Sequence, residues 1–365
     1  MLELELNPRL EQIRHQGFRE EAENVLRSGE LRKLIRLIGP VPGDSRERNI
    51  PAFEPAVDLA EVERETRFIR QEALARGLDM DEEFIQTMTY MRHITIPIQD
   101  PRLGRAISRV WSLVLWFDPD KEYNPEKHFL ALKHASAVAH PPSALMDYVD
   151  FSFEELGHSC DSDFLGLYKN LFFQYHLGTL LEVLVARHGA QRTTHSVRYI
   201  RDHNGSSEFW YLSLQFIDAR LSFARDPLFW VDTLEAARDF IAFTNDVFSF
   251  YKEAKSQLDF ENCYLFKQSQ TQKRPYLEVY RETLATTVRN YHAILESASS
   301  RAPELRAHVE HYLKSFIYWH FRSRRYLLQE VYPELRYWED RLSPPLTRAG
   351  GLTQPPPHLI ALNPG

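Results

Sequence analysis

Apolar residues recur three and four positions apart along most of this chain, whereas the alternating pattern typical of β-strands is nearly absent. Between residues 57 and 78, for example, charged residues stand at helical spacing among apolar ones, as in an amphipathic helix. Other helical stretches, such as residues 163–188, are so apolar and aromatic that we expect them in the core. The sequence therefore predicts an all-α fold.

Proline and glycine mark where these helices end. The segment 39–43 contains two prolines and two glycines and stops the first helix, and Asn204-Gly205 marks a later turn. We expect helices over residues 8–37, 57–78, 81–93, 103–117, 142–156, 163–188, 208–225, 227–255, 274–299 and 303–330. Residues 1–342 are predicted to form a single all-helical domain. The tail 343–365 has proline and glycine clusters without periodicity, so we expect it to be flexible or draped over the surface.

Composition and charge limit the partners of the chain. The hydrophobic fraction of 43% and the aromatic fraction of 13% suffice for a large core and an aromatic-lined cavity. The net charge of -7 argues against a broad attraction to nucleic acid, so an anionic ligand has to meet a local basic cluster. No stretch approaches the roughly 20 apolar residues of a membrane span, and two cysteines fit a reducing compartment. We expect a cytoplasmic protein with no nucleic-acid partner; monomer and homodimer both remain open.

The most informative segment lies inside the apolar helix predicted over residues 227–255. Asn245, Ser249 and Glu253 are spaced i, i+4, i+8, which places them within a roughly 80° arc of one helix face. An amide oxygen, a hydroxyl and a carboxylate are suitable ligands for a hard cation such as Mg²⁺. Spacing alone also fits incidental polar residues on a helix. Lys252 adds a positive charge beside this line of oxygen ligands.

The string Asn-Asp-Val-Phe-Ser-Phe-Tyr-Lys-Glu at residues 245–253 resembles the metal motif Asn-Asp-x-x-Ser-x-x-x-Glu of class I terpene cyclases, in particular of the fungal trichodiene synthase branch. The resemblance implies the class I terpene synthase helical bundle around a central apolar cavity. It also implies a sesquiterpene cyclase that ionises farnesyl diphosphate with about three Mg²⁺ ions. Asn245, Ser249 and Glu253 would be the metal ligands and Lys252 a catalytic cation.

Two further segments are similar to basic regions of the same family. Arg325-Tyr326 stands 80 residues after Asn245, where the family carries an Arg-Tyr pair that donates hydrogen bonds to the diphosphate. The planar fork of an arginine is suited to binding phosphate oxygens in pairs. Arg201, before the Asn204-Gly205 turn, would take the place of the arginine that senses the diphosphate in the family. Taken alone, Arg201 also fits an ordinary surface residue.

The family's aspartate-rich motif is degenerate in this chain, because the corresponding place contains Asp118, Pro119, Asp120 and Glu122. One register keeps Asp118 and Glu122 as metal ligands, and another leaves only Asp120. Pro119 disfavours helical geometry at the preceding residue, so the helix is expected to end or bend there. A solvated acidic loop is the alternative. This departure resembles a divergent group of fungal sesquiterpene cyclases, including α-humulene synthases, that lack the usual motif.

Aromatic rings in the predicted helices can shield a carbocation from water and stabilise its charge. The candidates for the cavity lining are Trp111, Trp116, Phe117, Phe172, Phe209, Phe243 and Trp319. Each of these rings, taken singly, also fits a plain core position. The expected product is a hydrocarbon such as humulene. A prenyltransferase and a non-catalytic isoprenoid-binding scaffold derived from a cyclase remain as alternatives.

Overall fold

The computed structural model describes residues 8–41, 52–116, 125–136, 143–187, 193–256, 263–301 and 303–342. Within these ranges the chain forms α-helices and short 3₁₀ turns and no strand, so the all-α prediction is confirmed. The helices are α1 (Pro8–Arg27), α2 (Arg32–Ile35), α3 (Leu59–Ala75), α4 (Glu82–Thr95), α5 (Pro101–Trp116), α6 (Pro125–Ala135), α7 (Ala144–Gly157), α8 (Ser162–Arg187), α9 (Thr194–Asn204), α10 (Ser207–Leu212), α11 (Pro227–Lys255), α12 (Tyr264–Gln272), α13 (Tyr276–Ser299) and α14 (Pro303–Arg322).

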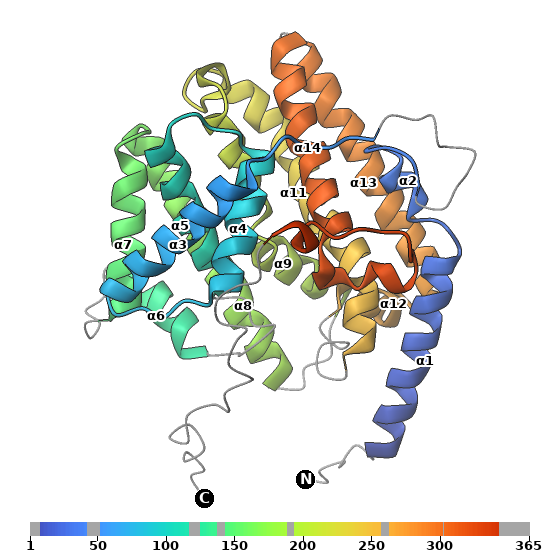
Figure 1. The fold of residues 1–365 in the computed structure, drawn as a ribbon. Helices are drawn as coiled ribbons and strands as arrows, with labels where there is room; N and C mark the ends of the chain where they lie inside the picture. The colour runs from blue at the N-terminus through green and yellow to red at the C-terminus, as the bar shows by residue number, and fades with distance from the viewer. Residues whose placement is uncertain are drawn as a thin grey trace, which may run out of the picture.

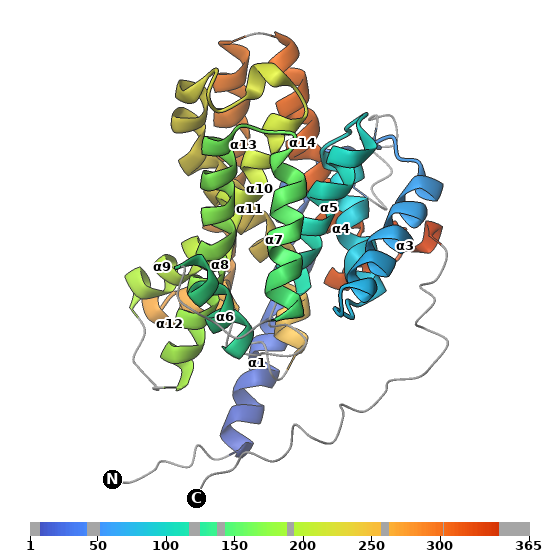
Figure 2. The ribbon, with the colours of Figure 1, turned by 90° about the vertical axis from the view of Figure 1, so that its left-hand side faces the viewer.

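The long helix α11 is the centre of the arrangement. It packs against α13, α14, α10 and α1, and its C-terminal half also contacts α9 and α12. In Figure 1 it runs through the middle of the molecule, with α4 and α5 on one side and α13 on the other. Figure 2 shows α3 at one edge with α4 and α5 inside it, and α9 and α12 near the opposite edge. Side chains on α11 therefore face several other helices at once.

Local sequence explains why α11 begins and ends where it does. Asp226 caps its first turn by accepting a hydrogen bond from the Phe229 amide at 3.2 Å, and Pro227 occupies the first helical position, where a missing N–H costs nothing. Trp230, buried along the helix, donates its indole N–H to the Leu221 carbonyl at 3.0 Å. The predicted range 227–255 matches the observed helix.

Three predicted helices are shorter than expected. The first breaks at Gly29, whose φ of 79° is in the left-handed region, so α2 is a separate short helix. The stretch 208–225 is α-helical only to Leu212 and continues as 3₁₀ turns at Ser213–Phe216 and Ala219–Leu221. The last helix ends at Arg322 and is followed by 3₁₀ turns, including Arg324–Tyr326. The short helices α6, α9 and α12 were missed because they are brief and lack a long apolar stripe.

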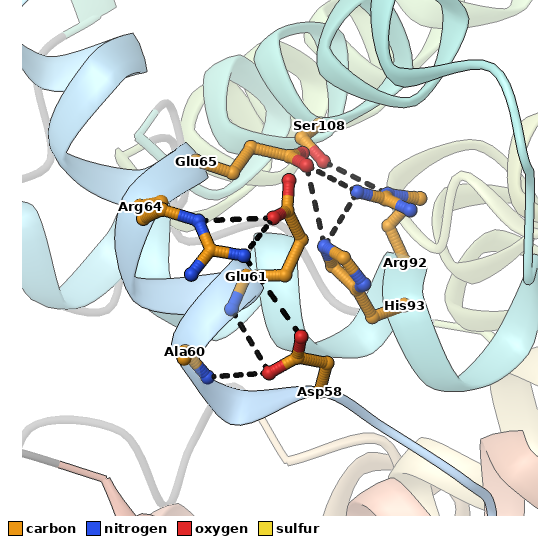
Figure 3. A network of polar contacts seen from close by, with 8 residues as sticks. All are labelled: Asp58, Ala60, Glu61, Arg64, Glu65, Arg92, His93 and Ser108. Atoms are coloured by element: carbon orange, nitrogen blue, oxygen red, sulfur yellow. Dashed lines mark hydrogen bonds and ion pairs between the residues drawn. The ribbon is translucent and has the colours of Figure 1, made fainter.

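A buried polar network joins α3, α4 and α5 (Figure 3). Arg92 donates to the Glu65 carboxylate and, through Nε, to the Ser108 hydroxyl at 3.2 Å. His93 lies 3.2 Å from the same Glu65 oxygen. Burial by itself would raise the pKa of Glu65, but the hydrogen bond with His93 and the charge of Arg92 lower it to about 2. The carboxylate therefore stays ionised and ties together the helices on one side of the cavity.

None of the helices in the described ranges combines the length and the apolar character that crossing a membrane would require.

Candidate active site

A cavity of about 240 Å³ opens beside the C-terminal half of α11. Helices α4, α5, α8, α9, α10, α12 and α14 contribute to its wall, together with the turn between α9 and α10 and the 3₁₀ turn after α14. Part of the wall is apolar and is made by Met88, Met91, Val114, Trp210, Ile241, Phe316 and Trp319. The rest is polar and charged, so the cavity presents an apolar surface beside an ionic one.

The three oxygen ligands predicted on α11 all lie in this wall. Asn245, Ser249 and Glu253 face the cavity because residues four apart stack on one side of a helix. Ser249 is only 1% exposed, and its hydroxyl has no hydrogen-bonding partner among the residues that the structure describes. A buried polar atom without a partner is costly, and such an atom in a native protein calls for an explanation such as an ion. The hydroxyl is therefore placed to meet a ligand that enters the cavity.

Arg201 reaches the cavity from α9 and binds α11 at two points. Its Nε donates to Oδ2 of Asp246 at 3.1 Å and its Nη2 lies 2.9 Å from Oδ1, while the same Nη2 donates to the Ala242 carbonyl at 2.9 Å. Burial raises the pKa of Asp246 to about 6; the charge of Arg201 works against this shift, and that of Glu253 adds to it. Asp246 was not singled out from the sequence, although it is the second residue of the metal motif.

Asn245 is held by partners from α9, α14 and the turn after α14. Its Nδ2 lies 3.2 Å from the Tyr326 hydroxyl and 3.4 Å from Nε2 of His320, while its Oδ1 accepts from Nη2 of Arg201 at 3.4 Å. Burial lowers the pKa of His320 to about 3, so the ring is neutral. His320 was not singled out from its sequence context, because its contact is with a residue 75 positions away.

The 3₁₀ turn Arg324–Tyr326 places Arg325 and Tyr326 in the cavity wall. Glu339 fixes this turn, because one of its carboxylate oxygens accepts from the Ser323 hydroxyl at 2.7 Å and from the Arg324 amide at 2.9 Å. The neighbouring Arg324 forms an ion pair with Asp340. Of the predicted cations, Arg201, Lys252 and Arg325 line the cavity, as does the hydroxyl-bearing ring of Tyr326.

Polar side chains on α8 and α12 support the last helical turn of α9, which carries Arg201. Glu182 accepts from Nδ2 of Asn204 at 2.9 Å and forms an ion pair with Lys267, while Nη1 of Arg201 donates to Oδ1 of Asn204 at 3.4 Å. Helices α8 and α9 approach very closely at Gly178, where an added Cβ would lie 2.5 Å from the Asn204 backbone nitrogen. Glu182 and Asn204 line the cavity as well and were missed from the sequence.

Most of the aromatic rings predicted to line the cavity lie elsewhere. Trp319 is in the wall, but Trp111, Phe172 and Phe209 pack in the interior behind it, and Phe243 stacks on Tyr264. Trp111 donates to the Tyr168 hydroxyl at 3.1 Å and meets Trp210 edge-on.

Trp210, the next residue after Phe209, is the one that reaches the cavity from α10. Successive side chains on a helix point about 100° apart, so the two rings face different directions. Trp116 is half-buried and outside the wall, and Phe117 lies outside the described residues.

The degenerate acidic motif cannot be placed in the same way. Asp118, Asp120 and Glu122 all lie outside the described residues. Within the part of the chain that the structure describes, no three His, Cys, Asp or Glu side chains cluster as a metal site would require. A metal site at this cavity would therefore depend on the amide and hydroxyl oxygens of α11 in addition to carboxylates.

Comparison with known proteins found one family model and similar solved structures. The family model of trichodiene synthase matches residues 229–341. This range includes Asn245, Ser249 and Glu253 on α11, here called the oxygen line, and the Arg325-Tyr326 pair. The crystal structure of 2-methylisoborneol synthase from Streptomyces coelicolor A3(2) has a similar fold, with a TM-score of 0.55 at 16% identity. The likeness covers 76% of this chain and 92% of that one. No curated protein sequence matches the chain.

Proposed function

Because the chain is a trichodiene synthase-like class I terpene cyclase, we propose that it ionises farnesyl diphosphate in the presence of Mg²⁺ and cyclises the carbocation to a hydrocarbon such as humulene. The proposal is supported above all by one observation. A single cavity brings the oxygen line Asn245, Ser249 and Glu253 together with Arg201, Arg325 and Tyr326, and these groups adjoin an apolar wall. An isoprenoid diphosphate has the same two parts, an anionic head and an apolar chain.

The residues present fit a magnesium site. Mg²⁺ prefers oxygen ligands and keeps several positions for water and substrate phosphate, so few protein ligands suffice. Ser249 has a buried hydroxyl that no described residue hydrogen-bonds, and Asn245 and Glu253 lie one turn to either side of it. We propose that these three side chains hold Mg²⁺, as part of a set of about three ions. When bound, the ions would supply positive charge to the departing diphosphate.

The chain's own cations would bind and orient the diphosphate. Arg201, Lys252 and Arg325 come from three different elements, so they can contact the anion from several sides. As the C–O bond breaks, its electron pair goes to the diphosphate, and N–H donors fixed in place beforehand stabilise the growing charge. The Tyr326 hydroxyl is positioned in the same wall for one further hydrogen bond.

The apolar wall would receive the allyl cation that is left. The rings of Trp210, Phe316 and Trp319 can stabilise positive charge with their faces, and the apolar residues exclude water that would otherwise trap the cation. Attack by the distal double bond of the chain then closes a ring and moves the positive charge. Loss of a proton to the released diphosphate gives the hydrocarbon.

We also keep Asp118, Asp120 and Glu122 as candidate metal ligands, with Asp118 first, Asp120 second and Glu122 third. A single carboxylate from this segment would complete the set of metal ligands. Separate alanine substitutions, each assayed for farnesyl diphosphate consumption across a Mg²⁺ titration, would rank the three acids. Full activity in all three variants would remove this segment from the metal site.

We further propose that residues 1–342 form the whole catalytic domain.

Product analysis tests the proposed function against its alternatives. Purified protein incubated with farnesyl diphosphate and Mg²⁺ is expected to release diphosphate and a volatile cyclic hydrocarbon. A prenyltransferase would instead need a second isoprenoid diphosphate and yield a longer diphosphate. A non-catalytic scaffold would bind the substrate and leave it intact. Either of these two results would overturn the proposal.

A further inference from the structure

His320 lies in the cavity wall and has no role in the function proposed above. It is 2% exposed, and its Nδ1 lies 2.8 Å from the Phe316 carbonyl oxygen one turn earlier on α14. A carbonyl oxygen can only accept, so Nδ1 carries the hydrogen. In a neutral imidazole the other nitrogen then presents a lone pair, and Nε2 is an acceptor.

That lone pair faces the side-chain amide of Asn245. Nδ2 of Asn245 lies 3.4 Å from Nε2 of His320, and on the other side of the amide Oδ1 lies 3.4 Å from Nη2 of Arg201. The reversed amide would bring Oδ1 against a lone pair and the NH₂ group against the N–H of an arginine, which are both repulsive. Chemistry at both ends therefore selects one orientation of the amide.

The imidazole ring is itself held in place by packing. The ring of Phe248 stacks against it at a centroid distance of 5.9 Å with the two planes 25° apart, and Trp319 meets it edge-on at 4.7 Å. Tyr326 lies at 5.1 Å and also accepts from Nδ2 of Asn245. Side chains on several sides thus prevent the ring from turning its lone pair away from Asn245.

We infer that His320 is a positioning residue that turns the Asn245 amide so that its oxygen is presented to the metal and diphosphate. The inference rests on the proposed function, because it assumes that Asn245 is a metal ligand. An amide nitrogen binds no Mg²⁺, so an amide free to flip would spend part of its time in a form that cannot bind. Residues that orient metal ligands from behind typically change metal affinity about 10- to 100-fold when replaced.

Metal binding in the presence of inorganic diphosphate tests the inference without turnover. His320→Phe keeps a ring of similar shape and removes the acceptor, so we expect the dissociation constant for Mn²⁺ or Mg²⁺, measured by calorimetry, to rise about tenfold. His320→Gln can place a carbonyl oxygen near the position of Nε2 and should restore most of the affinity. His320→Asn is too short to reach that position and should resemble the Phe variant.

If the Phe variant does not fold, the comparison of His320→Gln with His320→Asn still tests the inference. Both variants carry a polar amide, and only the longer Gln reaches the position of Nε2. Equal metal affinity in wild type, His320→Gln and His320→Asn would overturn the inference, since a role in packing alone would alter only the thermal unfolding temperature. Glu253→Gln separates this failure from failure of the proposed function. If Glu253→Gln also leaves metal binding unchanged, the metal site itself is misassigned. If it abolishes binding, only the role of His320 is wrong.

Discussion

The guanidinium of Arg201 and the carboxylate of Asp246 meet in a two-point contact between α9 and α11, with Nε 3.1 Å from Oδ2 and Nη2 2.9 Å from Oδ1. Asp246 follows Asn245 directly, so the contact ties Arg201 to the helix that carries the oxygen line. The arginine side chain is thus oriented before any ligand arrives. Most of the conformational entropy that binding a ligand would cost it has already been lost during folding.

Arg201→Lys should lower turnover at least about tenfold, because a lysine cannot make the paired contacts of a planar fork. The matched control is Arg198→Lys on the same helix, since Arg198 also pairs with aspartates, Asp202 and Asp239, but does not line the cavity. Steady-state kinetics with farnesyl diphosphate would compare the two variants. Equal activities would reduce Arg201 to a structural charge.

Ser249→Ala should lower turnover without lowering stability. Its hydroxyl is buried with no hydrogen-bonding partner in the described part of the chain, so its removal relieves a penalty of about 1–3 kcal/mol and the free energy of unfolding should be unchanged or raised. Ser315→Ala is the control, because the Ser315 hydroxyl donates to the Ile94 carbonyl at 2.8 Å. That variant should lose about 1 kcal/mol of stability and keep its turnover. Denaturant unfolding with parallel assays would show whether the two effects separate in this way.

Gly178→Ala should displace the last helical turn of α9, which carries Arg201 and Asn204. The new Cβ would lie 2.5 Å from a backbone nitrogen, which no rotamer change can relieve, so we expect a loss of about 1–3 kcal/mol in stability together with reduced turnover. On the same helix, an added Cβ at Gly166 would have no atom of the described residues within 4 Å, and Gly166→Ala should stabilise the protein by about 0.5–1 kcal/mol. Thermal unfolding of both variants checks the contrast; a tolerated Gly178→Ala would mean that the turn is not held by this contact.

The Glu65–Arg92 network predicts how stability depends on pH. The pKa of Glu65 is lowered to about 2 in the folded protein, so its contribution is present above its usual value of 4.5 and is lost as the pH falls towards 2. A difference of this size corresponds to about 3 kcal/mol. Glu65→Gln should therefore be much less stable than wild type at pH 7, with the gap narrowing below pH 4.5. Glu61→Gln, which alters an exposed pair with Arg64 in the same view (Figure 3), should change stability by less than about 1 kcal/mol. A gap for Glu65→Gln that stays constant with pH would contradict the account.

The sequence predicted the long helices well because their apolar periodicity is strong. The range 227–255 agrees with α11, whereas the break at Gly29 depends on a positive φ that a helical pattern does not reveal. The stretch after Leu212 changes to 3₁₀ turns that periodicity cannot distinguish from a continuing helix. Short helices such as α9 are stabilised by caps, here Thr193 with Ser196, more than by an apolar stripe.

The candidate site was predictable where its residues share one helix face or one short motif. Asn245, Ser249 and Glu253 lie in one wall because their spacing is a property of the helix itself. Residues such as Glu182 and His320 reach the cavity through contacts between distant segments, and a single sequence carries no signal for such contacts. Most of the predicted aromatic rings lie outside the observed wall for a related reason, because Phe209 and Trp210 are equally apolar and only the packing of α10 decides which one faces the cavity.

If Asn245, Ser249 and Glu253 on α11 support metal-dependent ionisation of an isoprenoid diphosphate, the rate of diphosphate release has to depend on Mg²⁺ and on these side chains. Wild-type protein with farnesyl diphosphate should release diphosphate only when Mg²⁺ is added. Glu253→Gln should reduce that rate at least about a hundredfold at saturating Mg²⁺, because it removes a charged metal ligand. Release that is independent of Mg²⁺, or a Glu253→Gln variant as fast as wild type, would contradict the claim.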